Sequence, residues 1–204
     1  MKIKICGLTN PENANEIVAL QPDFIGCIFT SISKRKIDIE QAKKINHPKK
    51  IGVFVNQSIS EITSTLKQIK LFAIQLHGNE TITFCNEIKQ HFPNIKIIKA
   101  FSIATQKDTI EIQNYSKVVD YFLFDTKGEN YGGNGISFDW EILNQIEINK
   151  PYFLSGGIEL ENLKNIKKLK QKPFAIDANS KLEDVVGIKN IVKTQKLIQY
   201  VQTI

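Results

Sequence analysis

The chain has 204 residues, enough for one large domain or two small ones that bury most of their apolar surface. Hydrophobic residues make up 42% of the sequence and charged residues 24%, which is ordinary for a soluble globular protein. No run approaches the roughly 18 consecutive apolar residues of a membrane helix. The N-terminal segment MKIKICGLTN has no apolar region or cleavage site typical of a secretion signal. We therefore expect a soluble protein without a membrane partner.

The formal net charge is +6, and the basic residues are spread along the chain rather than gathered in one block. Such a charge attracts anionic metabolites or keeps a protein in solution, and no nucleic-acid-binding motif accompanies it. We expect no nucleic-acid partner. The three cysteines, Cys6, Cys27 and Cys85, are too few and too scattered for a disulfide framework or a zinc site. They indicate a cytoplasmic location, where thiols stay reduced.

Short apolar runs alternate with amphipathic segments along the whole chain. The runs are rich in β-branched and aromatic residues and are apolar at consecutive positions, which is typical of strands buried on both faces of a parallel sheet. The predicted strands cover residues 2–6, 23–29, 50–55, 71–76, 95–101, 120–125, 151–156 and 174–178.

The segments between the strands have helical patterns, and some carry start signals. Asn10 and Pro11 predict an N-cap followed by proline at the first helical position. Ser58 and Glu61 have the spacing of a capping box. Further helical patterns follow Asn79 and Glu80, cover 104–117 and 137–147 more weakly, and follow Gly187.

Eight strands, each followed by a helix, give a mean repeat of about 25 residues, close to the minimum for a (βα)8 barrel. A doubly wound open sheet of this length normally has about five to seven strands. A flavodoxin-like or Rossmann fold is the alternative, but no G-x-G-x-x-G sequence follows the first strand. We predict one domain, residues 1–204, with the α/β fold of a (βα)8 TIM barrel.

In such barrels the active site lies at the C-terminal ends of the strands. Cys6 ends the first strand, where a lone cysteine is more often a small buried hydrophobe than a base. Basic residues 34–36 follow the second strand, and Arg35 is suited to a bidentate carboxylate partner. His77 follows the fourth strand and either lines the pocket or bonds the next turn. Asp125 ends the apolar sixth strand, either as a proton donor or as a cap of the loop.

Small residues follow the seventh and eighth strands. Backbone N–H groups at these two positions form the phosphate site that recurs in barrels. The sixth strand is followed by a glycine-rich run at 131–135, which suggests a backbone folded against a ligand. These features together indicate an enzyme that acts on a phosphorylated small molecule.

Taken in order, these loops closely resemble phosphoribosylanthranilate isomerases of tryptophan biosynthesis. The matching stretches are KICGLTNPENA, IGVFVN, IQLHGNE, LFDTKGENYGGNGISFDW, LSGGIELENL and IDANSKLE. They span nearly the whole chain. The opening K-I-C-G-L together with the G-G-x-G-x-x-F-D-W run is highly specific for this family.

The resemblance implies an Amadori rearrangement of N-(5-phosphoribosyl)anthranilate to 1-(2-carboxyphenylamino)-1-deoxyribulose 5-phosphate, with no metal and no organic cofactor. It implies that Asp125 protonates the furanose ring oxygen as general acid and that Cys6 takes the proton from C2 as general base. Arg35 would pair with the anthranilate carboxylate. The resemblance assigns the phosphate to residues of the last two loops: Gly156, Gly157, Asn179 and Ser180.

Two of the loops differ from the family's usual sequence, and the thiol of Cys6 would need a lowered pKa to act as a base at neutral pH. A thiol of ordinary pKa, about 8.5, is a weak base at neutral pH, and the sequence does not identify the group that would lower this pKa. Residues 33–35 read Ser-Lys-Arg where the family typically has Ser-Pro-Arg, so a more mobile loop is expected. Residues 179–181 read Asn-Ser-Lys where Ser-Ser-Gly is usual, which alters the phosphate cradle and adds the charge of Lys181.

Other functions fit a barrel less well. Sugar-phosphate isomerases of histidine biosynthesis, including dual-substrate relatives, carry an aspartate where Cys6 stands and show a stronger half-barrel repeat. Indoleglycerol-phosphate synthase uses catalytic lysines that this pattern lacks. A catalytically silent scaffold barrel would lack Cys6 or Asp125. The protein is expected to be a monomer or a homodimer, and segment 127–135 is the predicted mobile loop.

Overall fold

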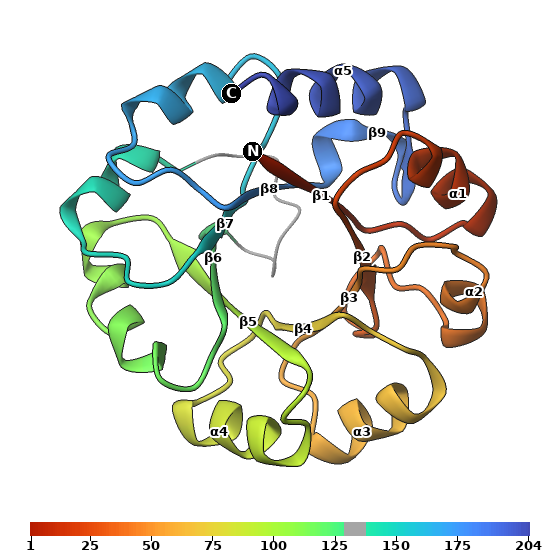
Figure 1. The fold of residues 1–204 in the computed structure, drawn as a ribbon, viewed down its shortest axis with the longest axis horizontal. Coiled ribbons are helices and arrows are strands. Elements are labelled where there is room, and N and C mark those ends of the chain that lie inside the picture. Colours follow the sequence, from red (N-terminus) through yellow and green to blue (C-terminus); the bar gives the residue numbers. More distant parts are fainter. Residues whose placement is uncertain (129–137) are drawn as a thin grey trace.

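The computed structural model describes residues 1–128 and 138–204, and a closed barrel of eight parallel strands forms its centre (Figure 1). The strands follow one another around the barrel in chain order, and pairing of β1 with β8 closes it. This confirms the predicted TIM barrel and excludes the open sheet. The strands are β1 Lys2–Cys6, β2 Phe24–Ile28, β3 Lys50–Phe54, β4 Ala73–Leu76, β5 Lys96–Ile103, β6 Tyr121–Thr126, β7 Tyr152–Leu154 and β8 Ala175–Ala178.

In the described part of the chain, five α-helices lie outside the strands in the ring that Figure 1 shows. They are α1 Pro11–Ala19, α2 Ile39–Lys43, α3 Ile59–Gln68, α4 Ile82–His91 and α5 Ile191–Gln202. The predicted caps Asn10 and Ser58 are confirmed, because each side chain accepts a hydrogen bond from a backbone N–H of its helix. Helix α4 is capped by Thr81 rather than opened by Glu80. Over the described ranges, no helix is both long enough and apolar enough to cross a membrane.

The described connections between β5 and β8 contain 3₁₀-helices rather than α-helices. They lie where helical patterns over 104–117 and 137–147 were expected, and also in the connection after β7. These are η1 Gln106–Thr109, η2 Ile112–Tyr115, η3 Trp140–Gln145 and η4 Leu163–Lys168. The 3₁₀ form is favoured in short pieces, and each of these has four to six residues. They still cover the barrel, because Ile112, Leu143 and Ile166 are buried in the core outside the strands.

Two further features complete the described chain. After β8 come the short helix η5 Ser180–Leu182 and an antiparallel pair of strands, β9 Glu183–Val185 and β10 Ile188–Lys189, which the sequence pattern did not predict. The glycine-rich run 131–135, and most of the segment 127–135 predicted to be mobile, lie outside the described residues.

The interior of the barrel is layered. Near the N-terminal ends of the strands it is filled by an apolar cluster: Phe24, Ile51, Ala73, Ile98, Ala100, Leu123, Phe153 and Ala175. Alternate residues of a strand face the same side, so the next inward positions toward the C-terminal ends are two residues further along. Several of these are polar, including Lys4, Gln75 and Asp177, all of which are buried. The apolar cluster is therefore the floor of a polar site.

Candidate active site

A cavity of about 340 Å³ opens at the C-terminal ends of the barrel strands. A smaller hollow adjoins it, because the two share Asp125, Ser155, Asp177 and Asn179 in their walls. The structure places all eight site residues predicted from the sequence in these walls. The cavity is lined by Cys6, Arg35, His77, Asp125 and Asn179, and the hollow by Gly156, Gly157, Asn179 and Ser180.

Cys6 and Asp125 are both buried and reach the cavity from β1 and β6, which are separated in the barrel by β7 and β8. A glycine makes room for the thiol. Gly26 of β2 pairs with Cys6, and a Cβ on Gly26 would lie 2.4 Å from Cys6 Sγ. Sequence analysis missed Gly26, because a glycine inside an apolar strand gives no sign of which side chain it faces.

A chain of hydrogen bonds orients Asp125. Oδ2 of Asp125 lies 3.1 Å from Nε2 of His77, and Nδ1 of His77 lies 2.5 Å from Nε2 of Gln75. The other end of the Gln75 amide, Oε1, accepts a hydrogen bond from Lys4 Nζ at 2.6 Å. Because Lys4 only donates, the amide NH₂ must face His77. His77 therefore accepts at Nδ1 and donates its Nε2–H to Asp125.

The second oxygen of Asp125 is also bonded. Oδ1 accepts a hydrogen bond from the backbone N–H of Thr126 at 2.8 Å. The carboxyl group is thus held from both sides while it lines the cavity. Asp125 therefore bonds the start of the following loop and also lines the cavity.

Lys4 and Asp177 form a buried ion pair in the barrel interior. Lys4 Nζ lies 2.7 Å from Asp177 Oδ2. Burial is the strongest single effect and opposes the charge of Lys4, but the charge of Asp177, its hydrogen bond and the interaction with Cys6 together raise the pKa of Lys4, so this side chain stays an ammonium ion. Sequence analysis did not single out either residue. The position of Lys4 could have indicated it, because a residue two positions before Cys6 lies on the same face of the strand.

The environment of Cys6 disfavours its thiolate overall. Burial raises the pKa of Cys6 above its ordinary value, and the negative charge of Asp177 acts in the same direction. The ammonium groups of Lys4 and Lys189 oppose this rise. Without substrate, Cys6 is therefore a thiol at neutral pH.

Arg35 is held at the cavity by Glu183 of β9. Nε and Nη2 of Arg35 each lie 2.8 Å from one carboxylate oxygen of Glu183, a bidentate arrangement. Lys189 of β10 bonds the same carboxylate at 2.7 Å and Asn179 Oδ1 at 2.7 Å. Burial opposes the ionisation of Glu183, but these two cations hold its pKa below the ordinary value. The remaining N–H groups of the guanidinium have no hydrogen-bond partner among the residues that the structure describes, and they are available for a second anion.

The smaller hollow depends on glycines after β7. Gly156 and Gly157 have φ angles of +89° and +62°, in the left-handed region that favours glycine. A Cβ on Gly156 would lie 2.1 Å from Thr126 Oγ1 and 2.7 Å from Thr126 N, so only glycine fits. Lys181, at the position of the family's usual glycine, also lines the hollow and pairs with Glu159 at 3.3 Å.

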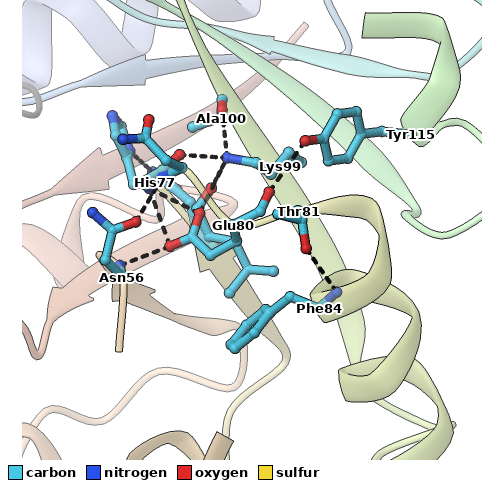
Figure 2. A network of polar contacts seen from close by, with 12 residues as sticks. Asn56, His77, Glu80, Thr81, Phe84, Lys99, Ala100 and Tyr115 are labelled. Carbon is cyan, nitrogen blue, oxygen red and sulfur yellow. Dashed lines mark hydrogen bonds and ion pairs between the residues drawn. The ribbon is translucent and has the colours of Figure 1, made fainter. Parts of the chain in front are cut away.

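A second buried ion pair holds the loop that carries His77 (Figure 2). Lys99 Nζ on β5 lies 3.1 Å from Glu80 Oε2, and these side chains are only 3% and 2% exposed. Lys99 also donates to the carbonyl oxygen of Gly78 at 2.7 Å. Glu80 accepts from the backbone N–H groups of Asn56 and Gly78 at 2.9 Å. The C-terminal ends of β3, β4 and β5 are tied together at this point.

We expect Lys99→Met to lower the free energy of unfolding by about 3–5 kcal/mol, because it leaves the buried carboxylate of Glu80 without its ion-pair partner. Lys96→Met on the same strand is the matched control. It removes an ion pair with Asp120 in which Lys96 is 49% exposed, and such pairs contribute at most about 1 kcal/mol. Urea denaturation measures both. Similar losses in the two variants would contradict the role of the buried pair.

Comparison with known proteins identifies the family. The sequence model described as N-(5'phosphoribosyl)anthranilate (PRA) isomerase matches residues 3–200. The chain belongs to this family. It is 41% identical over 208 residues to the N-(5'-phosphoribosyl)anthranilate isomerase of Parabacteroides distasonis, a match that covers 98% of this chain and 93% of that protein.

Solved PRA isomerase structures share the whole fold. The crystal structure of phosphoribosyl anthranilate isomerase from Thermotoga maritima is similar with a TM-score of 0.88 and 32% sequence identity, covering 100% of both chains. A PRA isomerase in complex with reduced 1-(o-carboxyphenylamino)-1-deoxyribulose 5-phosphate gives a TM-score of 0.83 and 30% identity, again over 100% of both chains. Membership in the PRA isomerase family confirms the resemblance seen in the sequence and excludes the alternative barrel families.

Proposed function

We propose that the chain isomerises N-(5'-phosphoribosyl)anthranilate to 1-(2-carboxyphenylamino)-1-deoxyribulose 5-phosphate, a step of tryptophan biosynthesis, with Asp125 as general acid and Cys6 as general base. One observation carries the assignment of roles. The two side chains line a single cavity at the C-terminal ends of the strands, beside the glycine-walled hollow. The reaction needs one group that donates a proton and one that accepts a proton, both within reach of the same sugar.

In the first step Asp125 donates its proton to the ribose ring oxygen, and the bond between C1 and that oxygen breaks. The lone pair of the anilino nitrogen forms a double bond to C1, which gives a protonated Schiff base. Asp125 is left as a carboxylate. The Nε2–H of His77 and the backbone N–H of Thr126 already point at its two oxygens, so the new charge forms among preset donors.

In the second step the thiolate of Cys6 takes the proton from C2. The electrons of that C–H bond form a double bond between C1 and C2, and the electrons of the C=N bond return to nitrogen. The product of this step is a neutral enolamine. Loss of the proton from the C2 hydroxyl and protonation of C1 then give the ketone, so the rearrangement balances with no gain or loss of atoms.

The remaining site residues are proposed to hold the substrate. The backbone around Gly156 and Gly157, with Asn179 and Ser180, would bind the phosphate, and the guanidinium N–H groups of Arg35 that do not bond Glu183 would bind the anthranilate carboxylate. Asp177 lines the same cavity, and its Oδ1 is buried without a hydrogen-bond partner among the described residues. It is suited to accept a hydrogen bond from a ribose hydroxyl.

We also infer a cytoplasmic location and a single-domain chain that acts as a monomer or a homodimer. The three free cysteines, all buried, support a reducing compartment. The closed barrel, in which β1 pairs with β8, supports the single domain. The location stays a prediction that cell fractionation tests, and the oligomeric state stays a prediction that light scattering tests.

The test of the function is an assay of the purified protein for loss of phosphoribosylanthranilate fluorescence. We expect turnover in buffer that contains a chelator and no added cofactor, because acid–base catalysis alone completes the rearrangement. A folded protein that does not consume this substrate would contradict the proposal.

A further inference from the structure

We propose that the buried ammonium group of Lys4 stabilises the thiolate of Cys6 and makes Lys4 a positioning residue for the proposed general base. The inference rests on the proposed function only in calling Cys6 the base. Its content is the ionisation of a thiol, which is measured without substrate.

The geometry brings the two side chains together. Lys4 and Cys6 are two residues apart on β1 and face the same side of the strand, into the barrel. Both side chains also meet at Gly26 of β2. A Cβ on Gly26 would lie 2.4 Å from Cys6 Sγ and 3.0 Å from Lys4 Cε. No side chain at position 26 separates the thiol from the end of the lysine.

Lys4 keeps its charge at this place. Its ammonium group donates to Asp177 Oδ2 at 2.7 Å and to Gln75 Oε1 at 2.6 Å, which uses two of its three N–H donors. The side chain is fully buried. A charge in such surroundings is screened far less than one at the surface, so its effect on a neighbouring thiol is large.

Several other charged or titratable groups face Cys6. Asp177 of β8 disfavours the thiolate, and Lys189 of β10 favours it but is itself paired with Glu183. Cys27 follows Gly26 on β2 and interacts electrostatically with Cys6, although its side chain packs in the core outside the barrel. The more distant groups of the cavity wall are Lys34, Arg35, His77 and Asp125. Among the charges that act on the thiol, that of Lys4 has the largest effect.

This arrangement predicts opposite effects from the two halves of one ion pair. Lys4→Met removes the positive charge, so the pKa of Cys6 should rise. Asp177→Asn removes the negative charge, while Gln75 Oε1 and the amide oxygen introduced at position 177 still accept hydrogen bonds from the ammonium group, so the pKa of Cys6 should fall. If the pair only packed the barrel interior, either replacement would admit water around the thiol. Both variants would then shift the pKa in the same direction, down toward its ordinary value.

The experiment measures the rate of alkylation of Cys6 by iodoacetamide as a function of pH, by mass spectrometry of the full chain without substrate. Cys27 and Cys85 are buried and do not line the cavity, so the Cys6 peptide reports the site. The midpoint of the pH curve should lie about 1 pH unit or more above that of the wild type in Lys4→Met, and below it in Asp177→Asn.

A second comparison controls for a loss of stability in Lys4→Met. Lys4→Met leaves the carboxylate of Asp177 buried and unpaired, which costs stability. The double variant Lys4→Met/Asp177→Asn carries neither charge and is compared with Asp177→Asn alone. The midpoint of the double variant should be the higher of the two, because only Lys4 differs between them.

Midpoints that move in opposite directions support the inference, and midpoints that move together, or that stay within about 0.3 pH unit of the wild type, overturn it. The outcome is independent of the proposed function. If the wild type fails to isomerise phosphoribosylanthranilate while the midpoints diverge, the stabilisation of the thiolate by Lys4 is supported and the role of Cys6 as base is contradicted. If Cys6→Ala loses activity while the midpoints coincide, the role of Cys6 as base is supported and the stabilisation of its thiolate by Lys4 is contradicted.

Discussion

Replacing Asp125 by asparagine should lower kcat for phosphoribosylanthranilate by about 10²–10⁴-fold, the usual contribution of a positioned general acid. Asparagine has the same shape but has no proton of suitable acidity for the ring oxygen, so ring opening loses its catalyst. KM should change little, because the groups proposed to hold the phosphate and the carboxylate are untouched. The fluorescence assay at saturating substrate measures the effect.

The stability of this variant has to be measured beside its activity. Both oxygens of Asp125 accept hydrogen bonds, from His77 and from Thr126. An asparagine turns its NH₂ group against one of these donors, which should cost about 1–3 kcal/mol of unfolding free energy. The assay is therefore run well below the unfolding transition. A folded Asp125→Asn protein with kcat within about tenfold of the wild type would show that another group is the acid.

Replacing Cys6 by alanine should lower kcat by about 10²-fold or more, because no proton acceptor then faces C2. The matched control is Cys27→Ala. Cys27 lies on the adjacent strand β2 and is equally buried, but its side chain packs in the core outside the barrel. The control should lose stability rather than kcat. Equal losses of kcat in the two variants would mean that packing, and not proton transfer, explains the result.

The fold was largely predictable from the sequence because strands buried on both faces are apolar at consecutive positions. Such runs stand out against the amphipathic segments between them, and Asn10 and Ser58 mark two helix starts with local hydrogen bonds. The 3₁₀ segments after β5 were not predictable. In a short connection the choice between 3₁₀ and α-helical turns depends on packing against the barrel, which local sequence does not encode.

The candidate site was predictable in part. Residues that end strands, such as Cys6 and Asp125, lie at the cavity because the C-terminal ends of parallel strands meet at one side of the barrel. The supporting charges were not predictable. Lys4 and Asp177 are 173 residues apart and meet only when β1 pairs with β8. A lysine in a strand read alone also resembles a surface residue, since lysines are rarely fully buried unless paired.

The central claim is that the thiolate of Cys6 is the base, and the pH dependence of kcat/KM in Asp125→Asn and in Asp125→Asn/Cys6→Ala tests it most directly. The replacement of Asp125 removes the general acid, whose loss of a proton with rising pH would offset the gain of thiolate in the wild type. Burial raises the pKa of Cys6 above its ordinary value, so the thiolate is a minority species at neutral pH. Its fraction grows about tenfold per pH unit below that pKa.

The kcat/KM of Asp125→Asn should therefore rise from about pH 7 to beyond about pH 9, and that of Asp125→Asn/Cys6→Ala should be lower and lack this rise. A flat profile of Asp125→Asn over this range, or the same rise in Asp125→Asn/Cys6→Ala, would contradict the assignment of Cys6 as the general base.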